Sequence, residues 1–180
     1  MHITTILGSP RSKGNTASVL SMAEMRLEAS KHDVTRFDVA KMKINGCLGC
    51  LKCQRPADGP ACVQKDDLSQ IFDSMMKADV IIYATPNYGW GPTAQLKAAL
   101  DRHLSLLTGY GTPQMGCHVS GKKAALLVTA MGPIEDNSDL LDRPFEKMIG
   151  MMQCESLGSF HLPGTIDPEM AAKAGPDLAD

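Results

Sequence analysis

Short aliphatic and β-branched runs alternate with longer stretches of helical period along most of this chain. The runs indicate strands at 2–7, 33–39, 79–86, 122–131 and 155–164, and the stretches between them indicate helices at about 15–30, 66–78, 92–107 and 138–153. This alternation predicts βαβ units, whose strands pair in parallel through right-handed crossovers. The third run, DVIIYATP, is apolar like a strand covered on both faces, whereas the second alternates in polarity like an edge strand.

The fold class expected from this pattern is α/β, with a doubly wound, five-stranded parallel sheet in the order 2-1-3-4-5 inside three α/β/α layers. We expect one domain over residues 1–180, because the chain has no internal repeat, low-complexity tract or linker. Sheets of this order bind ligands outside the carboxyl ends of the strands, beside strands 1 and 3. The loops expected at that edge are 8–16, 86–92 and 130–138.

The loop after the first strand, GSPRSKGNT, has the composition of an anion site. Its backbone N–H groups and the positive end of the next helix point toward one place, and Asn15 or Thr16 is expected to cap that helix. Polar side chains come from Ser9, Ser12, Asn15 and Thr16, and a cation from Arg11. The loop matches neither a P-loop nor a dinucleotide fingerprint. We expect it to bind a phosphate, and an ordinary Ser/Gly turn is the alternative.

The loop after the third strand, TPNYGWGP, has the composition of a site for a flat ring. Glycine lets the backbone approach a planar ligand closely, and its N–H groups can bond ring carbonyls and nitrogens. Tyr88 and Trp90 can line one face of such a ring. A phosphate site beside strand 1 and a ring site beside strand 3 together suit FMN.

Four segments resemble, in sequence and in order, the NADPH-dependent FMN reductase and iron–sulfur flavoprotein family of the flavodoxin-like superfamily: GSPRSKGNT, CLGCLKCQRPADGPACVQKDDL, TPNYGWGPTAQLKAALDR and GKKAALLVTAMGP. The resemblance implies a flavodoxin-like fold, FMN as cofactor, and a homodimer or homotetramer with flavins near the subunit interfaces. It implies that the FMN phosphate is bound by Ser9, Arg11, Ser12, Asn15 and Thr16. It implies that the isoalloxazine is held by Pro86, Asn87, Tyr88, Gly89, Trp90 and Gly91, with help from Ala130, Met131 and Gly132.

The loop at 45–64 carries four cysteines, Cys47, Cys50, Cys53 and Cys62, with the spacing C-x2-C-x2-C-x8-C. Three thiolates so spaced can bind one face of a [4Fe–4S] cluster while the fourth returns from beyond a turn. In the iron–sulfur flavoproteins that the motif resembles, the last spacing is usually shorter. Free or redox-sensitive thiols and a structural zinc are therefore the alternatives to a cluster. Cys117 and Cys154 are expected to be ordinary buried or loop thiols.

No side chain is expected to act as a catalytic acid or base, because a flavin itself carries out hydride and electron transfer. Asp101 and Arg102 are expected to form an ion pair on the surface of the third helix. His103 lies on the apolar side of that helix, where a hydrogen-bonded core or interface histidine is expected.

Charge and hydropathy exclude several classes of partner. The net charge of −2 creates no strong attraction to nucleic acid or to an anionic membrane. The longest apolar runs are far shorter than the roughly 20 residues that span a bilayer. The N-terminus lacks the basic start and long apolar run of a signal peptide. We therefore expect a cytoplasmic protein, in which six cysteines favour metal or redox chemistry over disulfides.

The sequence thus predicts an FMN-dependent NAD(P)H oxidoreductase that passes electrons to a small acceptor, such as free flavin, a quinone or another electrophile. The alternative is an iron–sulfur flavoprotein that relays single electrons between a ferredoxin and FMN through a cluster on the four cysteines. A third hypothesis is a flavin-binding sensor whose thiols report redox state. Consumption of NADPH separates the first from the others, and bound iron and sulfide separate the second from the third.

Overall fold

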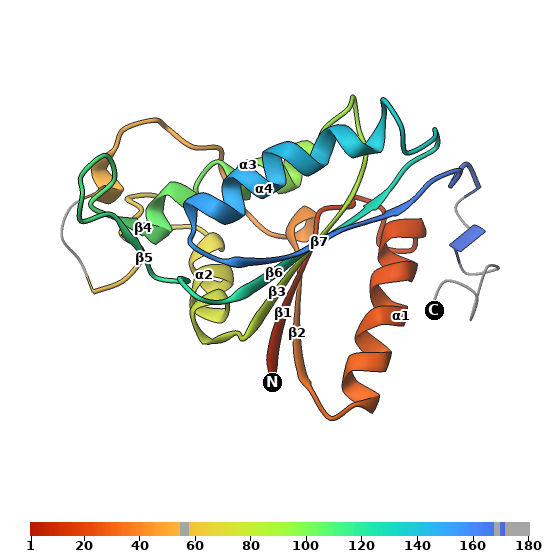
Figure 1. Cartoon of the computed structure of the whole chain (residues 1–180), viewed down its shortest axis with the longest axis horizontal. Helices are drawn as coiled ribbons and strands as arrows, with labels where there is room; N and C mark the ends of the chain where they lie inside the picture. The colour runs from red at the N-terminus through yellow and green to blue at the C-terminus, as the bar shows by residue number, and fades with distance from the viewer. Residues whose placement is uncertain (55–57, 168–169, 172–180) are drawn as a thin grey trace.

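The computed structural model describes residues 1–54, 58–167 and 170–171 of the chain. Its main feature is a parallel sheet of five strands in the order β2-β1-β3-β6-β7 (Figure 1). The strands are β1 (His2–Leu7), β2 (Asp33–Asp38), β3 (Val80–Pro86), β6 (Lys123–Thr129) and β7 (Glu155–Leu162). The predicted α/β class and the predicted order 2-1-3-4-5 are confirmed, with β2 at an edge and β3 in the centre.

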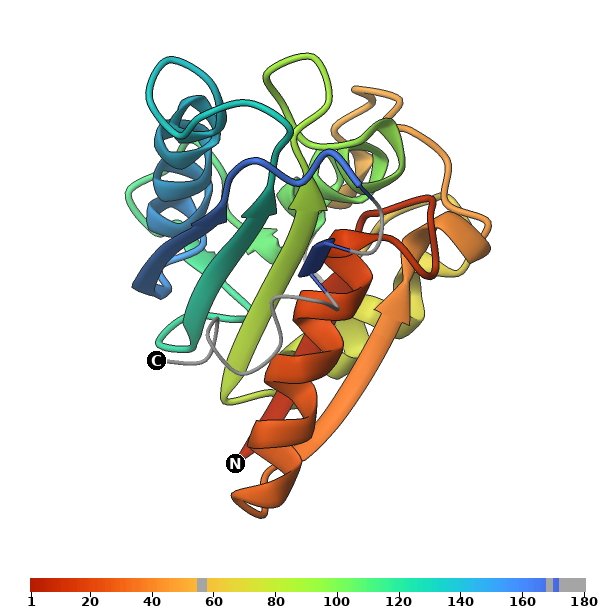
Figure 2. The ribbon, with the colours of Figure 1, turned by 90° about the vertical axis from the view of Figure 1, so that its right-hand side faces the viewer.

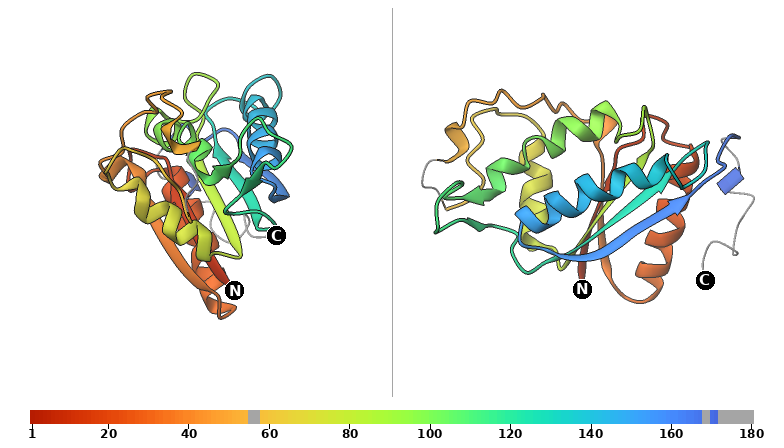
Figure 3. Two further views of the ribbon diagram at one scale, coloured as in Figure 1. Left: turned by 90° about the vertical axis from the view of Figure 1, so that its left-hand side faces the viewer. Right: turned by 45° about the horizontal axis from the view of Figure 1, so that its top comes forward.

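Helices cover both faces of this sheet unequally. On one face lies α1 (Asn15–Ala29), which Figure 2 shows in front of the strands. The other face carries α2 (Leu68–Lys77), α3 (Ala94–Leu100) and α4 (Asp142–Met151) (Figure 3). Within the described residues, no helix has both the length and the apolarity that a membrane crossing needs.

The larger hydrophobic core lies between the sheet and the three helices of the second face. Ile81 and Tyr83 of β3 and Leu126 of β6 point into it and are each at most 4% exposed. The α1 face holds a smaller core, which contains Leu20 and Ala84. Because alternate residues of a strand face opposite sides, a central strand that is covered on both faces is apolar at almost every position.

The buried side of α1 differs from a purely apolar stripe. Glu24 is 9% exposed, and its carboxylate accepts hydrogen bonds from Thr5 Oγ1 at 2.5 Å and from Arg36 Nη1 at 3.1 Å. The N-cap of this helix is Gly14, not Asn15 or Thr16, and no side chain makes a cap hydrogen bond. The predicted cap was therefore wrong by one or two residues. No side chain occupies the cap position at the N-terminus of α1.

Two other elements differ from the sequence expectation. The third helix, α3, ends at Leu100, and a separate short 3-10 helix, η3 (His103–Leu106), follows it. The single helix predicted to about residue 107 is therefore two elements. A small antiparallel sheet of β4 (Leu107–Thr108) and β5 (Gly116–Cys117) follows, and the sequence analysis missed it. In the last helix, a 3-10 turn, η4 (Ser138–Leu141), precedes α4, and Pro144 lies in the first turn of α4, where proline is tolerated.

Candidate functional site

Three loops meet at the carboxyl edge of the sheet, as the strand order requires. They follow β1, β3 and β6, and Figure 2 shows them at the end toward which the strands point. Between them lies a hollow of about 220 Å³. The predicted residues that line it are Ser9, Arg11, Asn15, Thr16, Pro86, Asn87, Tyr88, Ala130, Met131 and Gly132. Loops at three separate places in the sequence therefore form one site.

Ser12, Gly89, Trp90 and Gly91 do not line this hollow. The loop after β3 closes in a tight turn, in which the N–H of Tyr88 donates to Gly91 O at 2.9 Å and the N–H of Gly91 donates back at 3.2 Å. Gly89 and Trp90 form the tip of the turn with φ angles of 57° and 59°. This left-handed conformation places the indole outward, where Trp90 is 66% exposed.

One end of the hollow is lined by the N-terminus of α1 and by Arg11. Gly14 caps α1 with extended backbone, and the first N–H groups of a helix have no partner inside that helix. Arg11 is exposed at this end, and the Ser9 hydroxyl accepts a hydrogen bond from the Arg11 N–H at 3.2 Å. The helix dipole and the guanidinium both favour a negatively charged group at this position.

Asn15 and Thr16 are engaged with other parts of the chain. Thr16 is 2% exposed, and its Oγ1 lies 2.7 Å from Thr129 Oγ1, which joins α1 to the end of β6. The amide of Asn15 donates to the carbonyls of Thr165 and Asp167, and its Oδ1 accepts from the Ala171 N–H at 3.0 Å. The segment after β7 is thus tied to the N-terminus of α1.

The other end of the hollow contains a buried acceptor without a partner. Asn87 Nδ2 donates to Asn137 Oδ1 at 2.9 Å, and Asn137 Nδ2 donates to the carbonyl of Pro133 at 2.8 Å. Because a carbonyl only accepts, this chain determines the orientation of both amides. Asn87 Oδ1 is left buried and unpaired, one of two such side-chain atoms among the described residues. Asn87 is one of the residues that line the hollow, so this unpaired acceptor belongs to its wall.

Some lining residues were not identified from the sequence. They are Gly14, Thr129, Asn137, Thr165 and Ile166. The first three lie in or beside loops that were already expected at this edge, so a closer inspection of those loops would have found them. Nothing in the sequence indicated that Thr165 and Ile166 would come back to the first helix.

A second cavity, of about 440 Å³, lies on the other side of the loop after β3. It is bounded by α3 and α4, and its walls are mostly apolar. Trp90 and Gly91 line it instead of the first hollow, so the loop after β3 separates the two spaces.

The four cysteines of the 45–64 loop line a third, small cavity of about 30 Å³. Cys47 and Cys50 are exposed, whereas Cys53 and Cys62 are partly buried. Three of the sulfur atoms accept hydrogen bonds: Cys47 Sγ from Gly49 N, Cys53 Sγ from Gln54 Nε2, and Cys62 Sγ from Arg102 Nη2. We call this place the cysteine hollow. Its donor set, four thiols of which three accept hydrogen bonds from N–H groups, has the chemistry of a thiolate-bound cluster site.

The four thiols do not form a single-ion metal site in this structure. In the parts of the chain that the structure describes, no three Cys, His, Asp or Glu side chains are close enough together to hold one metal ion. The two remaining cysteines lie elsewhere and are half-buried. Burial raises the pKa of Cys117 and, with the nearby Cys117, raises that of Cys154 to about 11. Both are protonated thiols at neutral pH.

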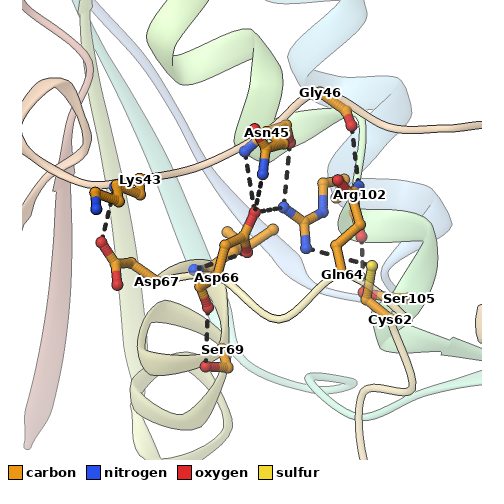
Figure 4. A network of polar contacts seen from close by, with 11 residues as sticks. Lys43, Asn45, Gly46, Cys62, Gln64, Asp66, Asp67, Ser69, Arg102 and Ser105 are labelled. Atoms are coloured by element: carbon orange, nitrogen blue, oxygen red, sulfur yellow. Dashed lines mark hydrogen bonds and ion pairs between the residues drawn. The ribbon is translucent and has the colours of Figure 1, made fainter.

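Arg102 does not form the expected surface pair with Asp101. It is 3% exposed, and its Nη1 lies 2.5 Å from Asp66 Oδ2 (Figure 4), while Asp101 pairs with Lys97 on the surface. Burial alone would raise the pKa of Asp66, but the hydrogen bonds from Arg102 and from the Asn45 N–H outweigh it and lower that pKa. The sequence prediction was wrong because it considered only neighbours on the same helix, and Asp66 comes from a different segment.

His103 is confirmed as a hydrogen-bonded core histidine. It is 1% exposed, with Nε2 at 2.8 Å from Tyr83 Oη and Nδ1 at 2.9 Å from the carbonyl of Ala99. Burial lowers the pKa of His103 to about 4, against smaller opposing effects of Ala99 and Asp101. The ring is therefore neutral at physiological pH.

A family model described as NADPH-dependent FMN reductase matches residues 1–142. An iron-sulfur flavoprotein of Archaeoglobus fulgidus is 38% identical over 104 residues, which are 58% of this chain and 46% of that protein. One of Methanocaldococcus jannaschii is 36% identical over 107 residues, which are 59% of this chain and 52% of that protein. The chain spans about half the length of these curated relatives.

Solved structures show the same fold at low sequence identity. An NAD(P)H:quinone oxidoreductase from Methanothermobacter marburgensis superposes with a TM-score of 0.72 at 18% identity, covering 99% of this chain and 98% of that one. An FMN-dependent NADH-azoreductase from Bacillus anthracis, in complex with FMN, gives 0.68 at 11% identity, with coverages of 99% and 96%. The arrangement of strands and helices is thus a known one.

Proposed function

Because the chain belongs to the NADPH-dependent FMN reductase family, we propose that it is an FMN-dependent NAD(P)H oxidoreductase. It takes electrons from NAD(P)H and delivers them to a small acceptor such as free flavin or a quinone. The observation that carries this proposal is the hollow at the carboxyl edge, in which one anion-binding end and one buried, unpaired acceptor lie in the same space.

The residues at the helix end would hold the phosphate of FMN. The N-terminus of α1 supplies backbone N–H groups and the positive end of a dipole, and Arg11 supplies a full positive charge. Thr16 and Asn15 contribute mainly by fixing the loop, since their side chains are bonded to Thr129 and to the segment after β7. Ser12 is exposed beside this end.

The residues at the other end would hold the isoalloxazine ring. The pyrimidine part of this ring carries an N–H group, and Asn87 Oδ1 is a buried acceptor that lacks one. Pro86, Tyr88 and the backbone of 130–132 form the adjoining walls. The bound flavin supplies the hydride- and electron-transfer chemistry, while the protein orients it and limits the access of water.

The test is NADPH consumption with an added acceptor, together with flavin retention in variants of the anion end. Arg11→Ala is expected to weaken FMN binding by about 10-fold or more, because a charge-assisted hydrogen bond contributes roughly 1.5–3 kcal/mol. The matched control is Lys123→Ala, which removes an exposed cation at the start of β6, at the opposite edge of the sheet. Equal FMN affinity in Arg11→Ala and wild type would show that the phosphate lies elsewhere.

We propose a second function, which is electron relay through a [4Fe–4S] cluster. All four cysteines line one hollow, and three of their sulfur atoms accept hydrogen bonds from N–H groups. The iron-sulfur flavoproteins among the sequence relatives support it. In that case a ferredoxin is the expected redox partner and NADPH turnover is slow. Iron, zinc and acid-labile sulfide should be determined on anaerobically purified protein. Iron and sulfide near four per chain support the relay, and flavin without metal supports the reductase alone.

We also propose that the protein acts in the cytoplasm as a homodimer or homotetramer, built from one domain over residues 1–180. The exposed Trp90 beside the 440 Å³ cavity supports self-association near the flavin, since large exposed aromatic side chains are typical of interfaces. Light scattering on the FMN-loaded protein measures this directly, and a monomer at micromolar concentration would contradict it.

A further inference from the structure

We propose that Arg102 is a positioning residue for the cysteine hollow: its guanidinium holds Cys62 in place as the fourth cluster ligand and raises the reduction potential of the cluster. This inference rests on the electron-relay function proposed above. The contacts of Arg102 with Asp66 and with Cys62 support it, and neither contact can be read from the cysteine spacing.

The two ends of the cysteine loop are joined by hydrogen bonds (Figure 4). The Lys43 N–H donates to Asp67 Oδ2 at 2.7 Å, and the Asn45 N–H donates to Asp66 Oδ2 at 3.0 Å. Gln64 Nε2 donates to the carbonyl of Gly46 at 3.0 Å. Segment 43–46, which leads to Cys47, is thereby fixed against segment 64–67, which follows Cys62.

Arg102 reaches into this junction from the short connection between α3 and η3. Its Nη1 donates to the carbonyl of Asn45 at 3.1 Å and to Asp66 Oδ2 at 2.5 Å, and its Nη2 donates to Cys62 Sγ at 3.3 Å. The side chains of Arg102 and Asp66 are only 2% and 5% exposed. One guanidinium therefore connects the entrance of the loop, its exit and one of its sulfur atoms.

The burial of this arginine is costly unless a further partner is present. Asp66 compensates the charge, but Arg102 Nε is buried without a hydrogen-bond partner, the second of the two such atoms in the described residues. Arg102 also lines the cysteine hollow itself. A cluster on the four cysteines would bring negative charge close to the guanidinium, whose Nη2 already donates to Cys62 Sγ.

The long spacing before the fourth cysteine gives this contact a function. In C-x2-C-x2-C the first three cysteines follow one another closely, whereas eight residues separate Cys62 from Cys53. A long connection leaves the last ligand poorly defined by local geometry, and ordering it costs conformational entropy. Arg102 fixes Cys62 through a hydrogen bond to the sulfur atom.

A hydrogen bond to a ligand sulfur and a nearby positive charge both stabilise the more negative, reduced state of a cluster. Removing Arg102 is therefore expected to lower the reduction potential. The test compares reconstituted wild type and Arg102→Gln by iron and sulfide content and by a redox titration followed by the EPR signal of the reduced cluster. We expect at least a tenfold lower ratio of reduced to oxidised cluster at a fixed potential, which is 59 mV for one electron.

The matched control is Lys97→Gln, which removes a cation from α3 that is exposed and paired with Asp101 at the surface. It is expected to keep the wild-type potential. Arg102→Lys keeps the charge but cannot reach three partners at once, and it is expected to give an intermediate potential. If Arg102→Gln does not fold, Arg102→Lys carries the comparison.

The cluster content and potential of Arg102→Gln distinguish the outcomes. Loss of the cluster from Arg102→Gln with full FMN retention supports the positioning of Cys62, and so does a lowered potential. A fully loaded Arg102→Gln with the wild-type potential would overturn the inference, as would an equal shift in Lys97→Gln. Wild-type protein that binds no iron after reconstitution refutes the relay function and this inference together, and it leaves the flavin site to be judged by NADPH consumption.

Discussion

Acidification should destabilise this protein through His103, and the size of the effect follows from the structure. His103 is 1% exposed, and the carbonyl of Ala99 can only accept, so Nδ1 carries the proton of the neutral ring and Nε2 accepts from the Tyr83 hydroxyl. Protonation of Nε2 would place a buried positive charge beside a hydroxyl that now donates to it. This is why the pKa of His103 is lowered from 6.5 to about 4 in the folded protein.

The sign follows from proton uptake. As the pH falls below 6.5, the unfolded chain binds a proton at His103 before the folded chain does, so the free energy of unfolding decreases until the pH reaches about 4. The full difference corresponds to about 3 kcal/mol, of which about 2 kcal/mol is lost between pH 7.5 and pH 5.0. Above pH 7 the contribution is fully present.

Urea unfolding followed by circular dichroism at pH 7.5 and pH 5.0 measures this loss. The comparison is with His103→Gln, which removes this ring and leaves every other ionisable side chain in place. Wild type should lose about 2 kcal/mol more than His103→Gln between the two pH values. An equal loss in both proteins would refute the reasoning.

Three further substitutions test how the site loops are held. Gly8→Ala should destabilise the fold by about 1–3 kcal/mol, because its Cβ would lie 2.8 Å from Leu96 Cβ; an unchanged melting temperature would contradict this. Thr93→Val removes the α3 cap on Leu96 N and the bond to Gly8 O, at a cost of about 1–2 kcal/mol in the same melts, and Thr93→Ser should restore most of it. Thr16→Val leaves the Thr129 hydroxyl buried and unpaired, which should cost about 1–3 kcal/mol by urea unfolding and loosen FMN. Unchanged stability and FMN affinity would show that this pair is dispensable.

The sequence led to the site through topology. Once the strands were recognised, right-handed parallel connections left few possible orders, and any such order brings the loops after β1, β3 and β6 to one edge. Arg11, Asn87 and Met131 were therefore placed in one site although they are far apart in the chain. The direction of the tip of the loop after β3 was not predictable, because it depends on the left-handed turn at Gly89 and Trp90.

The sheet, its strand order and the edge at which the hollow lies could be inferred from the sequence alone, because strand and helix periodicities are local and the handedness of parallel connections is general. Which polar groups contact one another depends on the tertiary structure. Arg102 was expected to pair with Asp101 beside it, and instead it is buried against Asp66 and Cys62. A buried charge takes its partner from whatever segment the packing brings near, and that choice depends on contacts between residues far apart in the sequence.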